Sequence, residues 1–177
     1  ALVPVAMRDL RERIGDAPLY MVGYSTGAAL AVEYALSALV DDTLPESTGL
    51  VLVSPAIGVT PLAALAVWQA RIGHLLGLDK LAWNSILPEY DPFKYNSFAV
   101  NAGDQVFRLT RAIRTALEDP SVQARLEAMP PILAFQSVVD ATVSTPALVA
   151  GLFDRLPVTG RHELVLFDIN RASEMEL

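Results

Sequence analysis

The sequence predicts an α/β fold, in which a parallel sheet is flanked by helices and carries an inserted helical cap. Short apolar runs typical of buried strands alternate with segments of helical periodicity, which is the pattern of a parallel sheet. Hydrophobic residues make up 53% of the 177 positions, enough for one domain with its own core. A glycine- and serine-containing turn joins the first apolar run to an alanine-rich helix. We therefore expect one domain over residues 1–177, with a core of 1–59 and 119–177 and a cap of about 60–118.

Composition narrows the classes of function. The formal net charge of −7 argues against nucleic acid as a partner, and no run of roughly 18 apolar residues predicts a transmembrane segment. The chain has no cysteine and two histidines, which excludes thiol catalysis and makes a metal site unexpected. No metal or organic cofactor is indicated. No signal peptide is visible, which favours a cytoplasmic location.

The first elements follow from hydrophobic spacing. Apolar positions among charged ones predict an amphipathic helix from the start of the chain to Gly15. A strand is expected from about Leu19. The next helix, from about Thr26 to Leu39, is apolar nearly all round and should be well buried.

Three further apolar runs predict the rest of the sheet. They are Leu50 to Val53, Ile132 to Gln136 and Leu164 to Phe167. Such continuous runs suit parallel strands that are buried on both faces. A helix is expected between the last two runs, from about Ser144 to Leu156.

The expected cap contains more than half of the aromatic residues of the chain. Those aromatic side chains could line an apolar pocket over the sheet, or form only the core of the cap itself. Arg108, Arg111 and Arg114 recur at helical i, i+3 spacing. This spacing favours a solvated basic face over an anion site.

The motif Gly23-x-Ser25-x-Gly27 lies where the first strand meets its helix. A serine on so tight a turn has a strained backbone, and small neighbours are needed where strand and helix cross. The turn also aims the first free N–H groups of the helix at a substrate, where they can stabilise an oxyanion. The simpler interpretation is a strand–helix turn with a capping serine.

This context resembles the serine α/β-hydrolases, which include esterases, lipases and lysophospholipase-like enzymes. The resemblance implies that Ser25 is the nucleophile and that the N–H of Thr26 forms half of an oxyanion hole. The stretch from Ser137 to Val143 is similar to the family's Gly-x-x-Asp-x-x-Val turn, with Ser137 in place of glycine. Asp140 would then orient the base, from the carboxyl end of a buried strand. The alternative is a helix-capping or turn aspartate.

The resemblance also requires a histidine just past the last strand, and none stands there. His162 precedes that strand, which at ~3.3 Å per residue carries it roughly 15–20 Å from the serine end. His74 lies in the expected cap, so both histidines are disfavoured as the base. Either the histidine lies beyond Leu177 in a longer protein, or another residue fills its place and the hydrolase is impaired.

We expect the first of these explanations, because the strands that normally precede the serine are missing as well. An apolar edge at Leu19 to Val22 would then be covered by another segment or chain. The expected activity is hydrolysis of a small hydrophobic carboxylic ester. The alternative is a catalytically impaired hydrolase-fold protein that binds an apolar ligand or a partner.

Overall fold

A computed structural model describes residues 2–58, 83–85, 98–138, 140 and 143–167. Its main feature is a four-stranded sheet in the order β1-β2-β5-β6, in which every pair of neighbours is parallel. The strands are β1 (Tyr20–Tyr24), β2 (Gly49–Val53), β5 (Ile132–Ser137) and β6 (His162–Phe167). The predicted fold class is confirmed, and each strand begins within two residues of its expected start.

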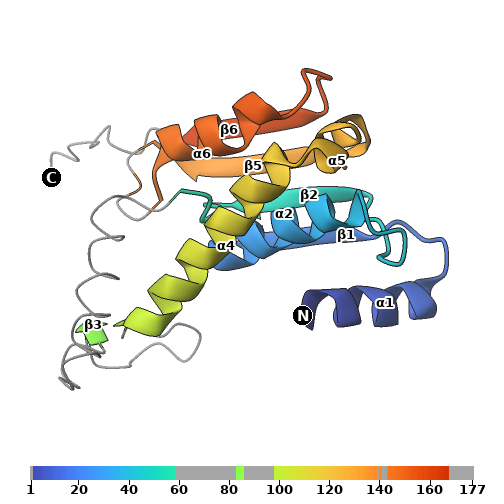
Figure 1. Ribbon diagram of the computed structural model, residues 1–177, viewed down its shortest axis with the longest axis horizontal. Helices are drawn as coiled ribbons and strands as arrows, with labels where there is room; N and C mark the ends of the chain where they lie inside the picture. The colour runs from blue at the N-terminus through green and yellow to red at the C-terminus, as the bar shows by residue number, and fades with distance from the viewer. Residues whose placement is uncertain (1, 59–82, 86–97, 139, 141–142, 168–177) are drawn as a thin grey trace, which may run out of the picture.

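The helices gather on one side of this sheet, as Figure 1 shows for α2, α4 and α6. They are α1 (Leu2–Ile14), α2 (Thr26–Ala38), α4 (Val100–Glu118), α5 (Pro120–Gln123) and α6 (Thr145–Gly151). The 3₁₀ turns Leu126–Ala128 and Phe153–Arg155 follow α5 and α6, and a separate antiparallel pair joins β3 (Trp83–Ser85) to β4 (Phe98–Ala99). The expected helix over 144–156 is therefore split into α6 and a 3₁₀ turn.

The main core lies between the sheet and α2, α4 and α6. Successive side chains of a strand point to opposite faces, and the face toward α2 carries Leu50, Leu52 and Ala134, all at most 2% exposed. The burial of α2 follows the sequence expectation, since eight of its residues are buried.

Most of the expected cap over residues 60–118 lies outside the described residues, so the boundaries of the cap stay a prediction. Its last helix, α4, packs Ile113 and Leu117 into the main core.

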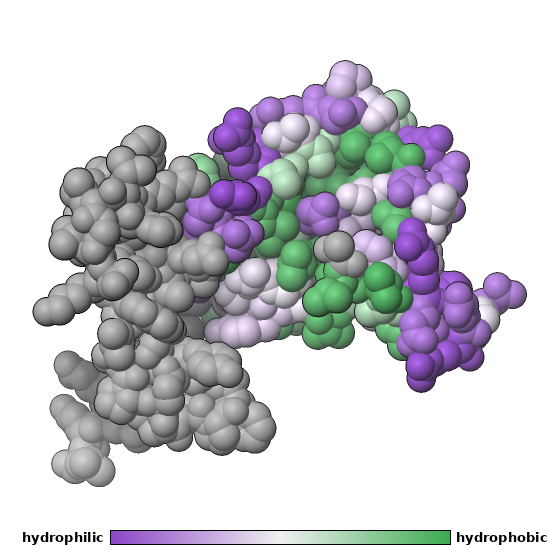
Figure 2. All heavy atoms as spheres, turned by 60° about the horizontal axis from the view of Figure 1, so that its bottom comes forward, coloured by the Kyte–Doolittle hydropathy of each residue, from purple (hydrophilic) through white to green (hydrophobic). Residues whose placement is uncertain are grey.

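The opposite face of the sheet is covered by no helix in the described part of the chain. Tyr20, Val22 and Tyr24 of β1 are 61%, 75% and 69% exposed there, and Phe135 stacks on Phe167 with ring centroids 6.1 Å apart. Figure 2 shows another side of the molecule, where hydrophobic surface (green) lies in the middle and hydrophilic surface (purple) lies around it, most densely at the lower right. None of the helices in the described ranges is long and apolar enough to cross a membrane.

Candidate active site

Parallel strands bring the two predicted catalytic side chains to the same edge of the sheet. Ser25 directly follows β1, and Asp140 lies three residues after β5, so both lie at carboxyl ends. Strand β2 lies between β1 and β5, which separates the two turns by about 10 Å at roughly 4.8 Å per strand. Open α/β sheets bind their ligands at this edge.

Ser25 has the strained backbone that the motif predicts. Its φ is 51° and its ψ is −117°, a region that costs a non-glycine residue of order 1–3 kcal/mol. Hydrogen bonds hold the turn in place: the Ser25 N–H donates to the carbonyl of Val53 over 2.9 Å, and the Ser25 carbonyl accepts from Ala56 N–H over 3.1 Å. The Ser25 hydroxyl makes no capping hydrogen bond to α2. Ser25 therefore occupies the N-cap position of α2 without capping the helix through its side chain.

The two glycines of the motif differ in what they permit. A Cβ at Gly23 would lie 2.5 Å from the Ala28 Cα and 2.6 Å from its nitrogen, so β1 and α2 cross where only glycine fits. A Cβ at Gly27 would meet no atom of the described chain within 4 Å. The expectation that both glycines serve the crossing is correct for Gly23 and wrong for Gly27, because Gly27 faces outward from the first turn of α2.

Thr26 opens α2, and its N–H donates to no backbone carbonyl in the described ranges. The first N–H groups of any helix lack an intrahelical partner. Beside a strained serine, this free donor at a helix N-terminus is suited to a developing negative charge.

The Asp140 carboxylate is held through both of its oxygens. Oδ1 accepts from the Val143 N–H over 3.0 Å, and Oδ2 accepts from Nε2 of Gln136 over 3.2 Å. Gln136 is 1% exposed on the core face of β5, and its Oε1 is buried without a hydrogen-bond partner. The bond to Val143 is one that a simple turn aspartate would also make, so Gln136 is the partner that distinguishes this carboxylate. The alternating pattern of β5 could have indicated Gln136 as a buried polar residue.

His162 lies at the amino end of β6, opposite Ile132, and so at the far edge from Ser25, as expected. Its ring is partly buried, and neither ring nitrogen has a hydrogen-bond partner in the described part of the chain. Burial lowers the pKa of His162 below its ordinary value, and the nearby Arg161 charge lowers it further. His74 lies outside the described residues.

Ser54 is a residue that sequence reasoning missed. It follows β2 directly, at the same edge as Ser25, and it has a positive φ of 45°. Its N–H donates to the carbonyl of Phe135 over 2.8 Å. The signal for it was a Ser-Pro pair directly after a buried strand, where a turn is expected.

Comparison with solved structures identifies the fold. The monoacylglycerol lipase of Paleococcus ferrophilus superposes with a TM-score of 0.58 at 22% identity, covering 93% of this chain and 63% of that one. A soluble variant of the Saccharomyces cerevisiae monoglyceride lipase, in complex with a substrate analogue, gives 0.62 at 14% identity, covering 94% and 57%. The metagenome-derived lipolytic enzymes LipS and LipT give 0.56 at 21% identity, covering 93% and 60%.

The chain therefore has the α/β-hydrolase fold. It spans about 57–63% of the length of these solved lipases. At such identities the likeness establishes the fold alone, because one fold supports many different reactions. No protein-family model matches the sequence, and no curated protein sequence matches it significantly.

Proposed function

We propose that this protein hydrolyses carboxylic esters with an apolar acyl or alcohol part through a serine acyl-enzyme. The observation that carries the proposal is the Ser25 turn. A positive φ, a hydroxyl that caps no helix and an unpaired neighbouring N–H occur together at the carboxyl edge of a parallel sheet. The strained backbone is costly for folding, and together with the free hydroxyl and the neighbouring N–H it suits a nucleophile.

In the proposed reaction, Ser25 Oγ attacks the ester carbonyl carbon while a base takes its proton. The Thr26 N–H stabilises the oxyanion, and the alcohol leaves with the proton as the acyl-enzyme forms. Water then attacks the acyl carbon, releases the carboxylic acid and restores the serine. Asp140 would orient the base. No histidine lies at this edge in the described ranges, so the proposal assigns the base to a histidine not identified here.

The substrate class follows from the fold and from composition. The solved lipases that share this fold include monoglyceride lipases, and the residues expected to form the cap are rich in aromatic side chains. A monoacyl lipid or a simple apolar ester is therefore the proposed substrate.

We also propose that further strands, from another segment or chain, cover the free side of β1. Within the described part of the chain, β1 pairs only with β2. Parallel sheets are usually buried on both faces and protected at their edges, whereas Val22 is 75% exposed.

A fluorophosphonate probe tests the nucleophile, because it reacts only with an activated serine. We expect the wild-type protein to be labelled at Ser25 and the Ser25→Ala variant to remain unlabelled. Ser54→Ala is the matched control, since Ser54 also has a positive φ at the same edge. If labelling survives in Ser25→Ala and disappears in Ser54→Ala, the reactive serine is Ser54 and the proposed role of Ser25 is wrong. No labelling of the folded wild-type protein would refute the proposal.

A further inference from the structure

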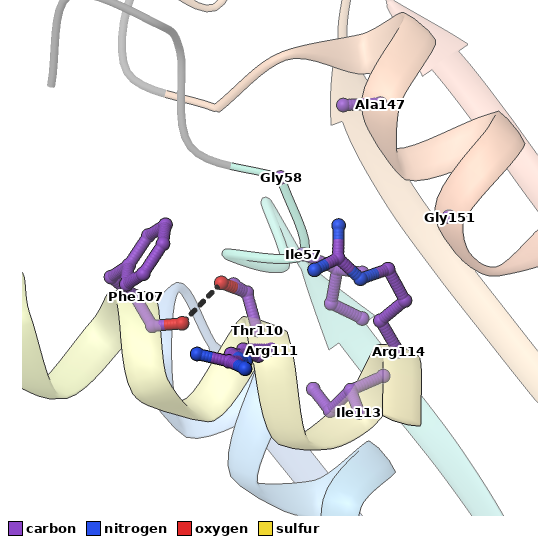
Figure 3. A pocket seen from close by; sticks show the side chains of 9 residues that line it. All are labelled: Ile57, Gly58, Phe107, Thr110, Arg111, Ile113, Arg114, Ala147 and Gly151. Atoms are coloured by element: carbon purple, nitrogen blue, oxygen red, sulfur yellow. Dashed lines mark hydrogen bonds between the residues drawn. The ribbon is translucent and has the colours of Figure 1, made fainter. Parts of the chain in front are cut away.

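A cavity of about 260 Å³ lies between α4, α6 and the segment that follows β2. Figure 3 shows its walls: Phe107 and Ile113 come from α4, Ala147 and Gly151 from α6, and Ile57 from the segment after β2. At about 30 Å³ per water molecule, the volume corresponds to roughly nine waters. This space can accept a short alkyl chain.

Two positive charges lie on the rim of this largely apolar cavity. Arg111 and Arg114 both line it, one helical turn apart on α4, and Figure 3 shows the Arg114 guanidinium between α4 and α6. Thr110 lines the cavity too, but its hydroxyl already donates to the Phe107 carbonyl over 2.9 Å. The side-chain groups of this cavity that can bind a polar ligand are therefore the guanidinium groups of Arg111 and Arg114.

Neither arginine is neutralised by the described part of the chain. On the same helix, Arg108 pairs with Asp104 over 2.8 Å and Glu118 pairs with Arg155 over 3.5 Å. Arg111 and Arg114 form no ion pair or hydrogen bond through their side chains there. All three arginines are exposed, so the expected solvated basic face is confirmed; within it Arg108 is paired, and Arg111 and Arg114 lie unpaired beside the cavity in the described part of the chain. In a chain with a net charge of −7, two such free cations on one cavity rim favour an anionic ligand.

We propose that this cavity binds a short-chain alkyl carboxylate, with its chain against the apolar walls and its carboxylate on Arg114 and Arg111. Guanidinium groups bind carboxylates through two parallel hydrogen bonds, which a neutral head group cannot match. An apolar ester releases such a carboxylate when it is hydrolysed. The inference does not depend on the proposed activity, because it concerns binding without turnover.

Calorimetric titration of the protein with sodium octanoate, 1-octanol and sodium acetate tests the proposal. Octanoate should bind saturably. Octanol, which lacks the charge, and acetate, which lacks the chain, should each bind at least about tenfold more weakly, since a charge-assisted hydrogen bond or a buried alkyl chain is lost. Equal binding of octanol and octanoate, or no binding of octanoate, would overturn the proposal.

Variants locate the site. Arg114→Gln should weaken octanoate binding about tenfold, a typical loss for a hydrogen bond to a charged group. Arg108→Gln is the matched control on the same helix, since Arg108 pairs with Asp104 and does not line this cavity, and it should change affinity less than about twofold. Gly151→Leu should block the chain from the cavity and abolish binding. An unchanged affinity in Arg114→Gln, or an equal loss in Arg108→Gln, would show that octanoate binds elsewhere.

Discussion

Replacement of Gly23 by alanine tests the close approach of β1 and α2. The added Cβ would lie 2.5 Å from the Ala28 Cα and 2.7 Å from the Gly27 carbonyl carbon, whereas carbon atoms pack at about 3.5–4.0 Å. β1 and α2 would have to separate by about 1 Å, and these are backbone atoms that cannot rotate aside. Overpacking typically costs 1–3 kcal/mol. Because Ala28 is fully buried, we expect a loss of about 3 kcal/mol, near the upper end of that range.

Gly27→Ala is the matched control, two positions past the serine in the same motif. Its Cβ meets nothing within 4 Å among the described atoms, and alanine in place of glycine stabilises a helix by up to about 1 kcal/mol. Urea unfolding followed by circular dichroism measures both variants. In a chain of this size, about 3 kcal/mol corresponds to a fall in Tm of about 6–12 °C. If Gly23→Ala costs less than about 1 kcal/mol, or Gly27→Ala costs as much, the crossing does not constrain the motif as argued.

Three further predictions concern other parts of the molecule. Val22→Lys changes a side chain that is 75% exposed on β1, so it should change the free energy of unfolding by less than about 0.5 kcal/mol. It should nevertheless reduce self-association of the protein in sedimentation experiments. Undiminished association would show that β1 does not mediate it. The lowered pKa of His162 means that the unfolded chain binds a proton first as the pH falls. Stability should therefore be greatest above about pH 6.5 and decline below it, and His162→Leu should flatten that decline in unfolding free energies measured from pH 8 to 5. Gln136→Met removes the hydrogen bonds that Nε2 donates to Asp140 and to the Ser137 carbonyl, and it also removes a buried oxygen that has no partner in the described chain, with costs and gains of about 1–3 kcal/mol each. Its Tm should therefore change little while fluorophosphonate labelling of Ser25 slows, and normal labelling would show that Gln136 does not position Asp140.

The strands could be predicted because each is a continuous apolar run with turn residues on both sides. Ile132 to Gln136 is an example: Pro130 and Pro131 mark its start, and β5 begins at Ile132. The strained serine was also predictable, because small residues at the spacing Gly23-x-Ser25-x-Gly27 are typical of a tight turn between a strand and a helix. Both the strands and the serine turn could be predicted because each depends only on residues that are neighbours in the sequence.

What could not be predicted depends on contacts between distant segments. The partial burial of His162 comes from its place beside Ile132 in the sheet, 30 residues away in the chain, and no local pattern encodes it. The same holds for Gly27, whose freedom from contact depends on how α2 crosses β1. The Arg108–Asp104 pair, by contrast, is an i,i+4 contact within α4 that local sequence could have indicated, whereas the place of Arg111 and Arg114 beside α6 could not be read from it.

Hydrogen bonds beyond the strand ends hold the first residue after each of three strands. Ser25 N–H donates to Val53, Ser54 N–H donates to Phe135, and Val138 N–H donates to Phe167, over 2.9, 2.8 and 3.0 Å. Each first residue after a strand thus continues the ladder onto the next strand. Because these bonds join the first residue of each turn to the sheet itself, the positions of Ser25, Ser54 and Val138 are set by the described strands. A base that reaches this edge from elsewhere would meet the proposed nucleophile on a turn that the sheet already holds, so the sheet would preorganise the Ser25 side of the proposed site.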